Sequence, residues 1–200
     1  MKAIKFIASL FVSATVLSSA IAGNAPKKAA EGLAVDTKGS KIHWLAKKVT
    51  GQHEGFISIS NGNLSVAKGK VTGGTFTIDM KSIVCTDITD AGYNQKFISH
   101  ITTGDFFEVE KYPTAIFKIT GIKKNNDKVY NSLVTGNLTV KGKTNTISFP
   151  AKITYANGTV SLASKKFSID RQKFDVAYKS TMQDVLVKDD MDLQVKVTAK

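Results

Sequence analysis

Apolar and polar residues alternate with a period of two along most of the chain after residue 33. Successive side chains of a β-strand point to opposite faces, so such a run predicts a strand with one apolar face and one wet face. The apolar residues of the four clearest runs are Phe76, Ile78 and Met80; Ala115, Phe117 and Ile119; Ile147, Phe149, Ala151, Ile153 and Tyr155; and Leu193, Val195, Val197 and Ala199.

Short stretches rich in Gly and Asn separate these runs and predict antiparallel hairpins between consecutive strands. The turn signals are Asn61-Gly62-Asn63, Lys68-Gly69-Lys70, Asn125-Asn126-Asp127, Lys141-Gly142-Lys143 and Asn157-Gly158. We therefore expect about eight strands, near residues 40–49, 54–60, 63–68, 71–80, 114–124, 128–141, 144–156 and 158–169, with a last long strand near 184–199.

One segment has helical spacing instead. Tyr93, Phe97 and Ile101 are four residues apart, which predicts a short amphipathic helix over residues 90–103, with Thr89 or Asp90 as its cap. One short helix cannot cover a sheet of so many strands, so the apolar face of the sheet must close on itself. The sequence thus predicts an all-β fold, an extended antiparallel barrel of about eight strands with one short helix.

A barrel of about eight strands is either filled by its own side chains or holds one slender ligand, and the sequence leaves both alternatives open. The candidate ligand-binding residues are those expected to face the interior and those on the helix and just after it. They are Phe76, Ile78, Phe97, Ile101, Phe106, Phe107, Phe117, Ile119, Leu138, Val140, Phe149 and Phe167.

The first 22 residues have the pattern of a signal peptide. Lys2 and Lys5 precede an apolar stretch that is shorter than the roughly 20 residues of a membrane-spanning helix. Ala20 and Ala22, on either side of Ile21, form an A-x-A cleavage site. We expect residues 1–22 to be removed on export. Residues 23–33 are expected to form a flexible leader, and residues 34–200 a single domain.

The basic residues restrict the class of partner. The formal net charge is +12, but 27 of the 28 basic residues are Lys and the single Arg is Arg171. Because nucleic-acid-binding proteins depend on the bidentate guanidinium group of Arg, this composition argues against a DNA or RNA partner.

The only Cys is Cys85, which we expect to be a buried thiol; an intermolecular disulfide and a reactive thiol are the alternatives.

Several motifs resemble those of the YceI-like family. Residues 105–114 read DFFEVEKYPT and are followed by AIF, which is similar to that family's DFFDVEKYP-x-x-x-F signature. Weaker matches lie in the expected order around it: Asp36 with SKIHW at 40–44, HEG at 53–55, GNLTVKG at 136–142 and IDRQKF at 169–174. The resemblance covers roughly residues 34–199.

This resemblance implies a fold and a function. The fold is a lipocalin-like antiparallel barrel, exported to the periplasm. The barrel is expected to enclose a long polyisoprenoid lipid, such as a prenylated quinone or a polyprenyl alcohol or phosphate, and to carry or sequester it without bond chemistry and without a cofactor. Contact with a membrane surface and formation of a homodimer stay open.

The element at residues 170–174 contains the only Arg of the chain. We expect Arg171 either to pair with a carboxylate such as Asp105 or Asp170 and brace the end of the barrel, or to contact the head group of a ligand. Arg171 and Phe174 complete the set of candidate ligand-binding residues.

The sequence contains no known catalytic motif, and we expect no enzyme activity. His43, His53 and His100 lack the spacing of a metal site, so no metal is expected either. The acidic residues at 189, 190 and 192 lack the spacing of a Ca²⁺ loop and are expected to form a solvated turn. Two alternatives to lipid binding remain. The protein is then either an enzyme of isoprenoid lipid metabolism or a barrel with a filled core that contacts anionic surfaces through its Lys side chains.

Overall fold

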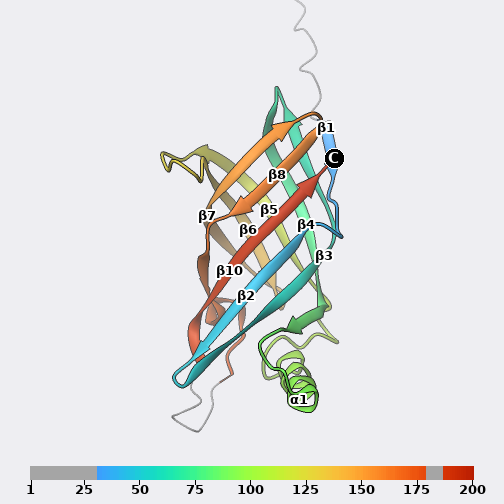
Figure 1. The fold of residues 1–200 in the computed structure, drawn as a ribbon, viewed down its shortest axis with the longest axis vertical. Coiled ribbons are helices and arrows are strands. Elements are labelled where there is room, and N and C mark those ends of the chain that lie inside the picture. The colour runs from blue at the N-terminus through green and yellow to red at the C-terminus, as the bar shows by residue number, and fades with distance from the viewer. Residues whose placement is uncertain (1–30, 179–186) are drawn as a thin grey trace, which may run out of the picture.

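Eight antiparallel strands form a closed barrel in a computed structural model that describes residues 31–178 and 187–200. The strands follow one another around the barrel in the order β3-β2-β10-β8-β7-β6-β5-β4, and β4 pairs with β3 to close it (Figure 1). Their bounds are β2 (Lys41–Lys48), β3 (Gly51–Ala67), β4 (Lys70–Cys85), β5 (Thr114–Lys124), β6 (Ser132–Val140), β7 (Lys143–Ala156), β8 (Thr159–Ser164) and β10 (Val187–Ala199). The all-β barrel with one α-helix that the sequence predicts is therefore confirmed.

Two short strands lie outside this ring. β1 (Glu31–Ala34) pairs with β3, and β9 (Phe167–Asp170) pairs with β10. Leu33 in β1 is buried, so the prediction of a flexible leader is wrong for residues 31–33. The rest of that leader and the signal peptide predicted for residues 1–22 lie outside the described residues.

The two-residue turns between the long strands have the expected chemistry. Lys68-Gly69, Lys141-Gly142 and Asn157-Gly158 all have positive φ at both positions, between 48° and 74°. This is the backbone of a type I′ turn, whose twist matches that of the strands it joins. These turns fix the register of the β3–β4, β6–β7 and β7–β8 hairpins.

The turn expected at Asn61-Gly62-Asn63 is wrong, because β3 runs straight through it and pairs with β4. A Cβ atom at Gly62 would lie 3.0 Å from both the Thr75 carbonyl oxygen and Val35 Cγ2. Gly is needed here for close packing within the sheet. Similarly, the single strand expected at 158–169 is divided into β8 and β9, which pair with successive parts of β10.

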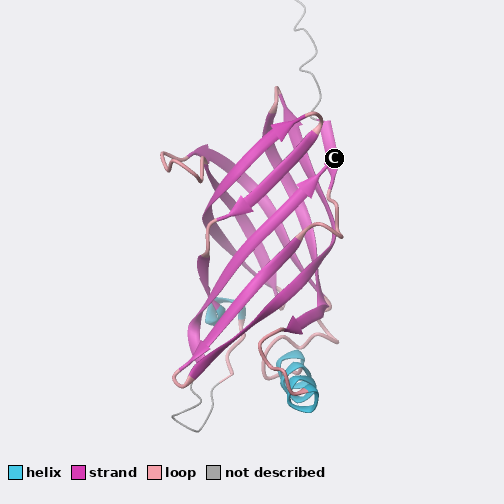
Figure 2. Ribbon diagram, viewed as in Figure 1, coloured by secondary structure: helices cyan, strands magenta, loops and turns pink. Residues whose placement is uncertain are grey.

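The helix α1 (Ala91–Thr102) agrees closely with the segment predicted from the sequence. The Asp90 carboxylate accepts a hydrogen bond from the Tyr93 N–H and so caps the first turn, with an Oδ1–N distance of 2.7 Å. A short 3₁₀ helix, η1 (Arg171–Phe174), lies at the same end of the barrel as α1 (Figure 2). Across the described residues, no helix combines the length and the apolar character needed to cross a membrane.

Candidate functional site

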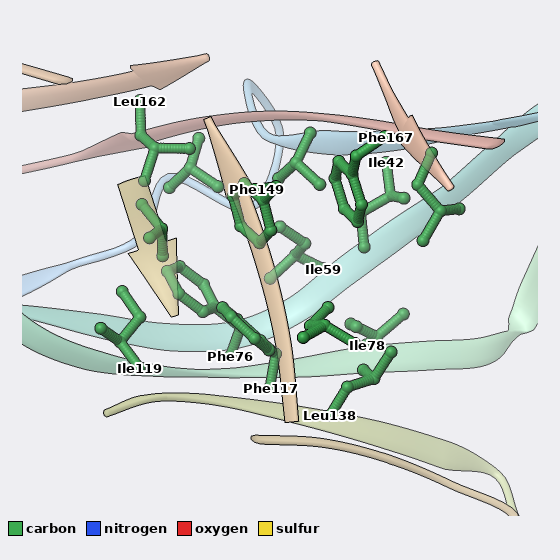
Figure 3. Close-up of a pocket in the computed structure, with 15 residues that line it drawn as sticks. Ile42, Ile59, Phe76, Ile78, Phe117, Ile119, Leu138, Phe149, Leu162 and Phe167 are labelled. Carbon is green, nitrogen blue, oxygen red and sulfur yellow. The ribbon is translucent and has the colours of Figure 1, made fainter. Parts of the chain in front are cut away.

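The interior of the barrel contains a cavity of about 60 Å³, which we call the inner cavity. It is lined by fifteen residues, and every one is Ile, Leu, Val or Phe (Figure 3). They are Ile42, Ile59, Phe76, Ile78, Phe117, Ile119, Val134, Leu138, Ile147, Phe149, Leu162, Phe167, Leu193, Val195 and Val197. With no hydrogen-bonding side chain in its lining, this space favours an apolar occupant over water.

A row of four phenylalanine rings crosses this interior. The ring centroids of Phe76 and Phe117 are 6.3 Å apart, those of Phe117 and Phe149 5.7 Å, and those of Phe149 and Phe167 4.4 Å. The rings come from β4, β5, β7 and β9, so the row spans the barrel from wall to wall. Each pair lies within the range of favourable aromatic contacts.

A larger cavity of about 310 Å³, the mouth cavity, lies where α1 and η1 meet the end of the barrel. Its apolar lining includes Trp44, Ile57, Ile83 and Met191 from the strands. Polar residues also line it: Lys47, Lys48, His53, Tyr93, His100, Arg171, Tyr178 and Lys188. Its volume is at the lower end of the range of small-molecule sites, about 300–1,000 Å³.

The two cavities follow each other along the same inward face of the barrel. On β2, Ile42 lines the inner cavity and Trp44 lines the mouth cavity; on β10, Leu193 and Met191 do the same. Residues two apart on one strand face are about 7 Å apart. The cavities therefore form two consecutive parts of one apolar path.

The structure places twelve of the fourteen candidate residues around these cavities. Phe76, Ile78, Phe117, Ile119, Leu138, Phe149 and Phe167 line the inner cavity, and Phe97, Ile101, Phe106, Phe107 and Arg171 line the mouth cavity. Val140 and Phe174 belong to neither lining. Val140 is the last residue of β6, beside a turn, and the Phe174 side chain is buried in the core.

Sequence reasoning missed several lining residues. Ile42 and Ile59 lie between polar neighbours, and Leu162 lies two residues after Val160 with Ser161 between them, so all three could have been found from the same period of two. Trp44 and Met191 continue the same alternation, two residues from Ile42 and Leu193. Tyr178 has no such signal, because its place in the mouth cavity depends on how α1 and η1 pack against the barrel end.

The Trp44 side chain carries an unusual polar group. It is only 4% exposed, and its indole Nε1 is buried without a hydrogen-bond partner among the described residues. A buried donor without a partner is costly, about 1–3 kcal/mol.

Arg171 is buried and holds the segment around it together. Its guanidinium group donates to the carbonyl oxygens of Val176, Val187 and Lys188, and it pairs with Asp189 at 3.0 Å. The prediction that Arg171 pairs with Asp105 or Asp170 is wrong. Asp105 pairs with His100, and Asp170 caps η1, because β10 brings Asp189 to the guanidinium group instead.

The His residues are separated on the fold. His43 contacts Glu54 on the outer face of the barrel at 3.1 Å, opposite in direction to the buried Trp44, as the alternation predicts. His53 instead meets Cys85 and Asp87, and one ligand atom from each of these three lies within 4.8 Å of the others. The sequence did not predict this group, because His53 lies far along the chain from the other two residues.

Hydrogen bonds in this group perturb two ionisations. Burial alone would raise the pKa of Asp87, but bonds from the Glu54 N–H, the Cys85 thiol and the His53 ring outweigh it and hold the pKa at about 2. Burial, together with the neighbouring Asp87, raises the pKa of the Cys85 thiol. Cys85 is therefore a buried thiol that donates to Asp87 Oδ1 at 3.1 Å.

The acidic residues near the end of the chain do not form the solvated turn that the sequence suggests. Asp192 is a buried residue of β10. Its carboxylate accepts from Lys47 Nζ at 2.8 Å and from Ser168 Oγ at 2.6 Å, and these bonds lower its pKa. The pair ties β2 and β9 to β10 beside the mouth cavity.

Asp192 is expected to make the stability of the protein depend on pH below about 4. Because its folded-state pKa is lowered, its contribution is fully present above the unfolded pKa of about 3.9 and is lost as the pH falls through the folded value. Urea unfolding of the wild type and of Asp192→Asn, measured between about pH 6 and pH 2, checks this. The difference between the two unfolding free energies should shrink as the pH falls, and a constant difference would contradict the assignment.

Comparison with known proteins identifies the family. The sequence model of a protein family, described as the YceI-like domain, matches residues 33–199 of this chain. A UPF0312 protein of Pseudomonas aeruginosa is 34% identical over 88 residues, and Protein YceI of Escherichia coli is 27% identical over 126 residues. The first match covers 40% of this chain and 44% of the relative, and the second covers 59% and 61%. The chain thus matches less than half of the first relative's length.

Solved structures share the fold. The crystal structure of Burkholderia cenocepacia BcnA has a TM-score of 0.67 at 22% identity and covers 83% of this chain and 99% of its own. A polyisoprenoid binding domain from Saccharophagus degradans, implicated in plant cell wall breakdown, has a TM-score of 0.61 at 11% identity, with 84% and 97% covered. At these identities the similarity establishes the barrel alone. The domain match over almost the whole described barrel establishes more: the chain belongs to the YceI-like family.

Proposed function

We propose that this protein binds one long isoprenoid lipid, with the apolar tail in the barrel and the polar end in the mouth cavity. The observation that carries the proposal is the inner cavity, whose fifteen lining residues are all apolar. A prenyl tail forms no hydrogen bonds, and its burial contributes about 0.8 kcal/mol per CH₂. The Saccharophagus degradans domain, described as polyisoprenoid binding, supports the same ligand class.

The polar end of the ligand belongs in the mouth cavity because the polar groups are there. Among the groups that line this space, the Lys48 ammonium and the Tyr178 hydroxyl are hydrogen-bond donors. An oxygen atom of a quinone, alcohol or phosphate accepts hydrogen bonds from such donors. The apolar path then leads from this cavity into the inner cavity, which fits a ligand with one polar end.

The inner cavity of about 60 Å³ has room for only a short part of a long tail. Complete burial therefore requires the phenylalanine row to open. The Phe167 side chain is half-buried, and its ring stacks on that of Phe149. A change of rotamer at these two rings would extend the cavity along the barrel.

Fluorescence of Trp44 provides a direct test, because it is the only Trp of the chain. A prenylated quinone is expected to quench this fluorescence and to saturate at one molecule per protein. The same quinone without its tail should bind at least a hundredfold more weakly, because most of the buried apolar surface is lost. A long polyprenyl alcohol should compete with the prenylated quinone for binding. If the tailed and tailless quinones bind equally, the tail does not enter the barrel and the filled-core alternative is favoured.

Filling the inner cavity is expected to abolish binding of the tail. Val195 lines that cavity and is only half-buried, so Val195→Phe adds a ring where there is space for it. We expect at least a tenfold loss of affinity for the prenylated quinone in the Trp44 assay. The matched control is Gln194→Phe, which places the same ring on the exposed outer face of β10 and should leave the affinity unchanged.

The proposed chemical role is binding without catalysis. Recovery of a stoichiometric, unmodified prenyl lipid by native mass spectrometry from protein purified from its own host supports this role. Conversion of the lipid during incubation supports an enzyme instead. Recovery of apo protein alone, together with no binding in the Trp44 assay, favours a filled core.

Export to the periplasm is also part of the proposal. It rests on the signal-peptide pattern of residues 1–22. Intact-mass measurement of the protein from the periplasmic fraction should give a chain that begins at Gly23. A chain retaining Met1 in the cytoplasm would contradict the assignment.

A further inference from the structure

We propose that His53, Cys85 and Asp87 form a binding site for a divalent metal ion of the Zn²⁺ type, at the junction between the barrel wall and the segment leading into α1. His53 lies on β3, Cys85 is the last residue of β4, and Asp87 follows two residues later. His53 Nδ1 is 2.9 Å from Asp87 Oδ2, and Cys85 Sγ is 3.1 Å from Asp87 Oδ1. The site borders the mouth cavity, which His53 also lines, but binding of a metal ion there does not depend on the proposed lipid.

The donor set fits the chemistry of zinc. Zn²⁺ takes Cys sulfur at about 2.3 Å and His nitrogen and carboxylate oxygen at about 2.0–2.2 Å, in a tetrahedral arrangement. Ligand atoms around such an ion are roughly 3.3–3.7 Å apart. The three ligand atoms lie within 4.8 Å of one another, so the two hydrogen-bonded pairs must open by a few tenths of an ångström and the widest pair must close by up to about 1 Å. Three protein ligands leave a fourth position for water.

Charge and protons balance at the site. The ion displaces the proton of the Cys85 thiol, which leaves to solvent, so that thiolate and carboxylate together neutralise the two positive charges. His53 binds as neutral imidazole through Nδ1, so the proton that Nδ1 now shares with Asp87 is lost to solvent and Nε2 carries the remaining ring proton. Asp87 can keep one of its present bonds, because Oδ1 accepts from the Glu54 N–H at 2.9 Å while Oδ2 is directed at the position of the ion.

Hydrogen bonds from outside the group hold the ligands in place. The Thr86 N–H donates to the Glu54 carbonyl oxygen at 2.9 Å, which fixes the strand end between Cys85 and Asp87 against β3. From α1, the Asn94 side chain donates to the carbonyl oxygens of Cys85 and Ile88, at 3.0 and 2.9 Å. Such supporting bonds orient metal ligands and raise affinity.

His53 is oriented as well. Its ring packs against that of Phe97 on α1, with centroids 4.8 Å apart, and its side chain is 18% exposed. A metal ion at this site would join the wall strand β3 to the segment from which α1 starts. Because α1 lines the mouth cavity through Tyr93, Phe97 and Ile101, the ion would hold the start of a helix that forms part of the cavity wall.

Titration with Co²⁺ tests the site, since Cys85 is the only Cys and any thiolate-to-cobalt charge-transfer band must come from it. Tag-free full-length protein, reduced and freed of metal, is expected to give this near-ultraviolet band with one Co²⁺ per chain, and Zn²⁺ should remove it by displacement. Cys85→Ser should lose the band. His53→Gln and Asp87→Asn, whose side chains are partly exposed and should fold, are expected to weaken binding at least tenfold.

His43→Gln is the matched control. His43 also pairs with a carboxylate, that of Glu54, but lies away from the thiol on the outer face. Its Co²⁺ affinity should equal that of the wild type. Saturating Zn²⁺ should also raise the Tm of the wild type and of His43→Gln but not of Cys85→Ser. Absence of the band in the folded wild type, or equal Co²⁺ binding in wild type and His53→Gln, would overturn the proposal and leave a hydrogen-bonded triad.

Discussion

Gly55→Ala is expected to destabilise the barrel by about 3 kcal/mol or more, although it adds only one methyl group. Gly55 on β3 is directly opposite Cys85 on β4. A Cβ atom at this position would lie 1.8 Å from the Val84 carbonyl oxygen and 2.9 Å from Trp44 Cζ2. Because the first of these is a backbone atom, no side-chain rotation removes the clash, and the two strands must separate.

Gly73→Ala provides the control for this experiment. Gly73 lies in β4, opposite Ser65 of β3, but a Cβ atom there meets nothing within 4 Å. We expect its unfolding free energy to stay within about 1 kcal/mol of the wild type. Urea unfolding of the two variants measures the difference. Equal stabilities would mean that β3 and β4 can move apart locally without cost, contrary to the close contact at Gly55.

Arg171→Met is expected to cost about 4 kcal/mol of unfolding free energy. The substitution leaves the carbonyl oxygens of Val176, Val187 and Lys188 without the donor that now serves all three, and each such loss costs about 1–3 kcal/mol. The ion pair with Asp189 contributes less, because that carboxylate side chain is 58% exposed. The unfolding free energy of Arg171→Lys should lie between those of the wild type and Arg171→Met, since an ammonium group cannot donate in the forked geometry of the guanidinium group.

Lys173→Met separates this effect from a simple loss of positive charge. Lys173 belongs to the same 3₁₀ helix, but its side chain is exposed, so its substitution should leave the stability nearly unchanged. The Trp44 assay for the prenylated quinone distinguishes the two roles of Arg171. A lowered Tm with unchanged lipid affinity in Arg171→Lys indicates a structural role. Unchanged stability with weakened affinity for the quinone indicates contact with the head group.

The architecture could be predicted from the sequence because it depends on local patterns. Period-two runs indicated most strands, the Lys-Gly and Asn-Gly pairs indicated three of the turns, and the spacing of Tyr93, Phe97 and Ile101 indicated the helix. The error at Gly62 has a physical cause. Gly serves tight turns and close packing within a sheet equally well, and the sequence around Gly62 does not distinguish these roles.

The candidate site was less accessible to sequence reasoning because it depends on contacts between distant segments. Of the two alternatives for Arg171, the structure shows a carboxylate partner, but the choice of Asp189 depends on how β10 passes η1. Similarly, His53 and Asp87 are 34 residues apart and meet only because β3 and β4 pair in one register. The volume of the interior depends on the rotamers of the phenylalanine row, which no pattern in the sequence encodes.

The pairing of β2 with β10 has a consequence for how the protein folds. The hairpins from β3 to β8 join neighbours in the sequence, whereas β2 pairs with a strand about 150 residues further on, as at His43 and Gln194. Contacts of such long sequence separation form slowly. The ring therefore cannot be completed until the last strand has been synthesised, and the growing chain remains an open sheet until then. Until then the edge of β2 that will pair with β10 is open to proteases and chaperones, whereas its other edge already pairs with β3.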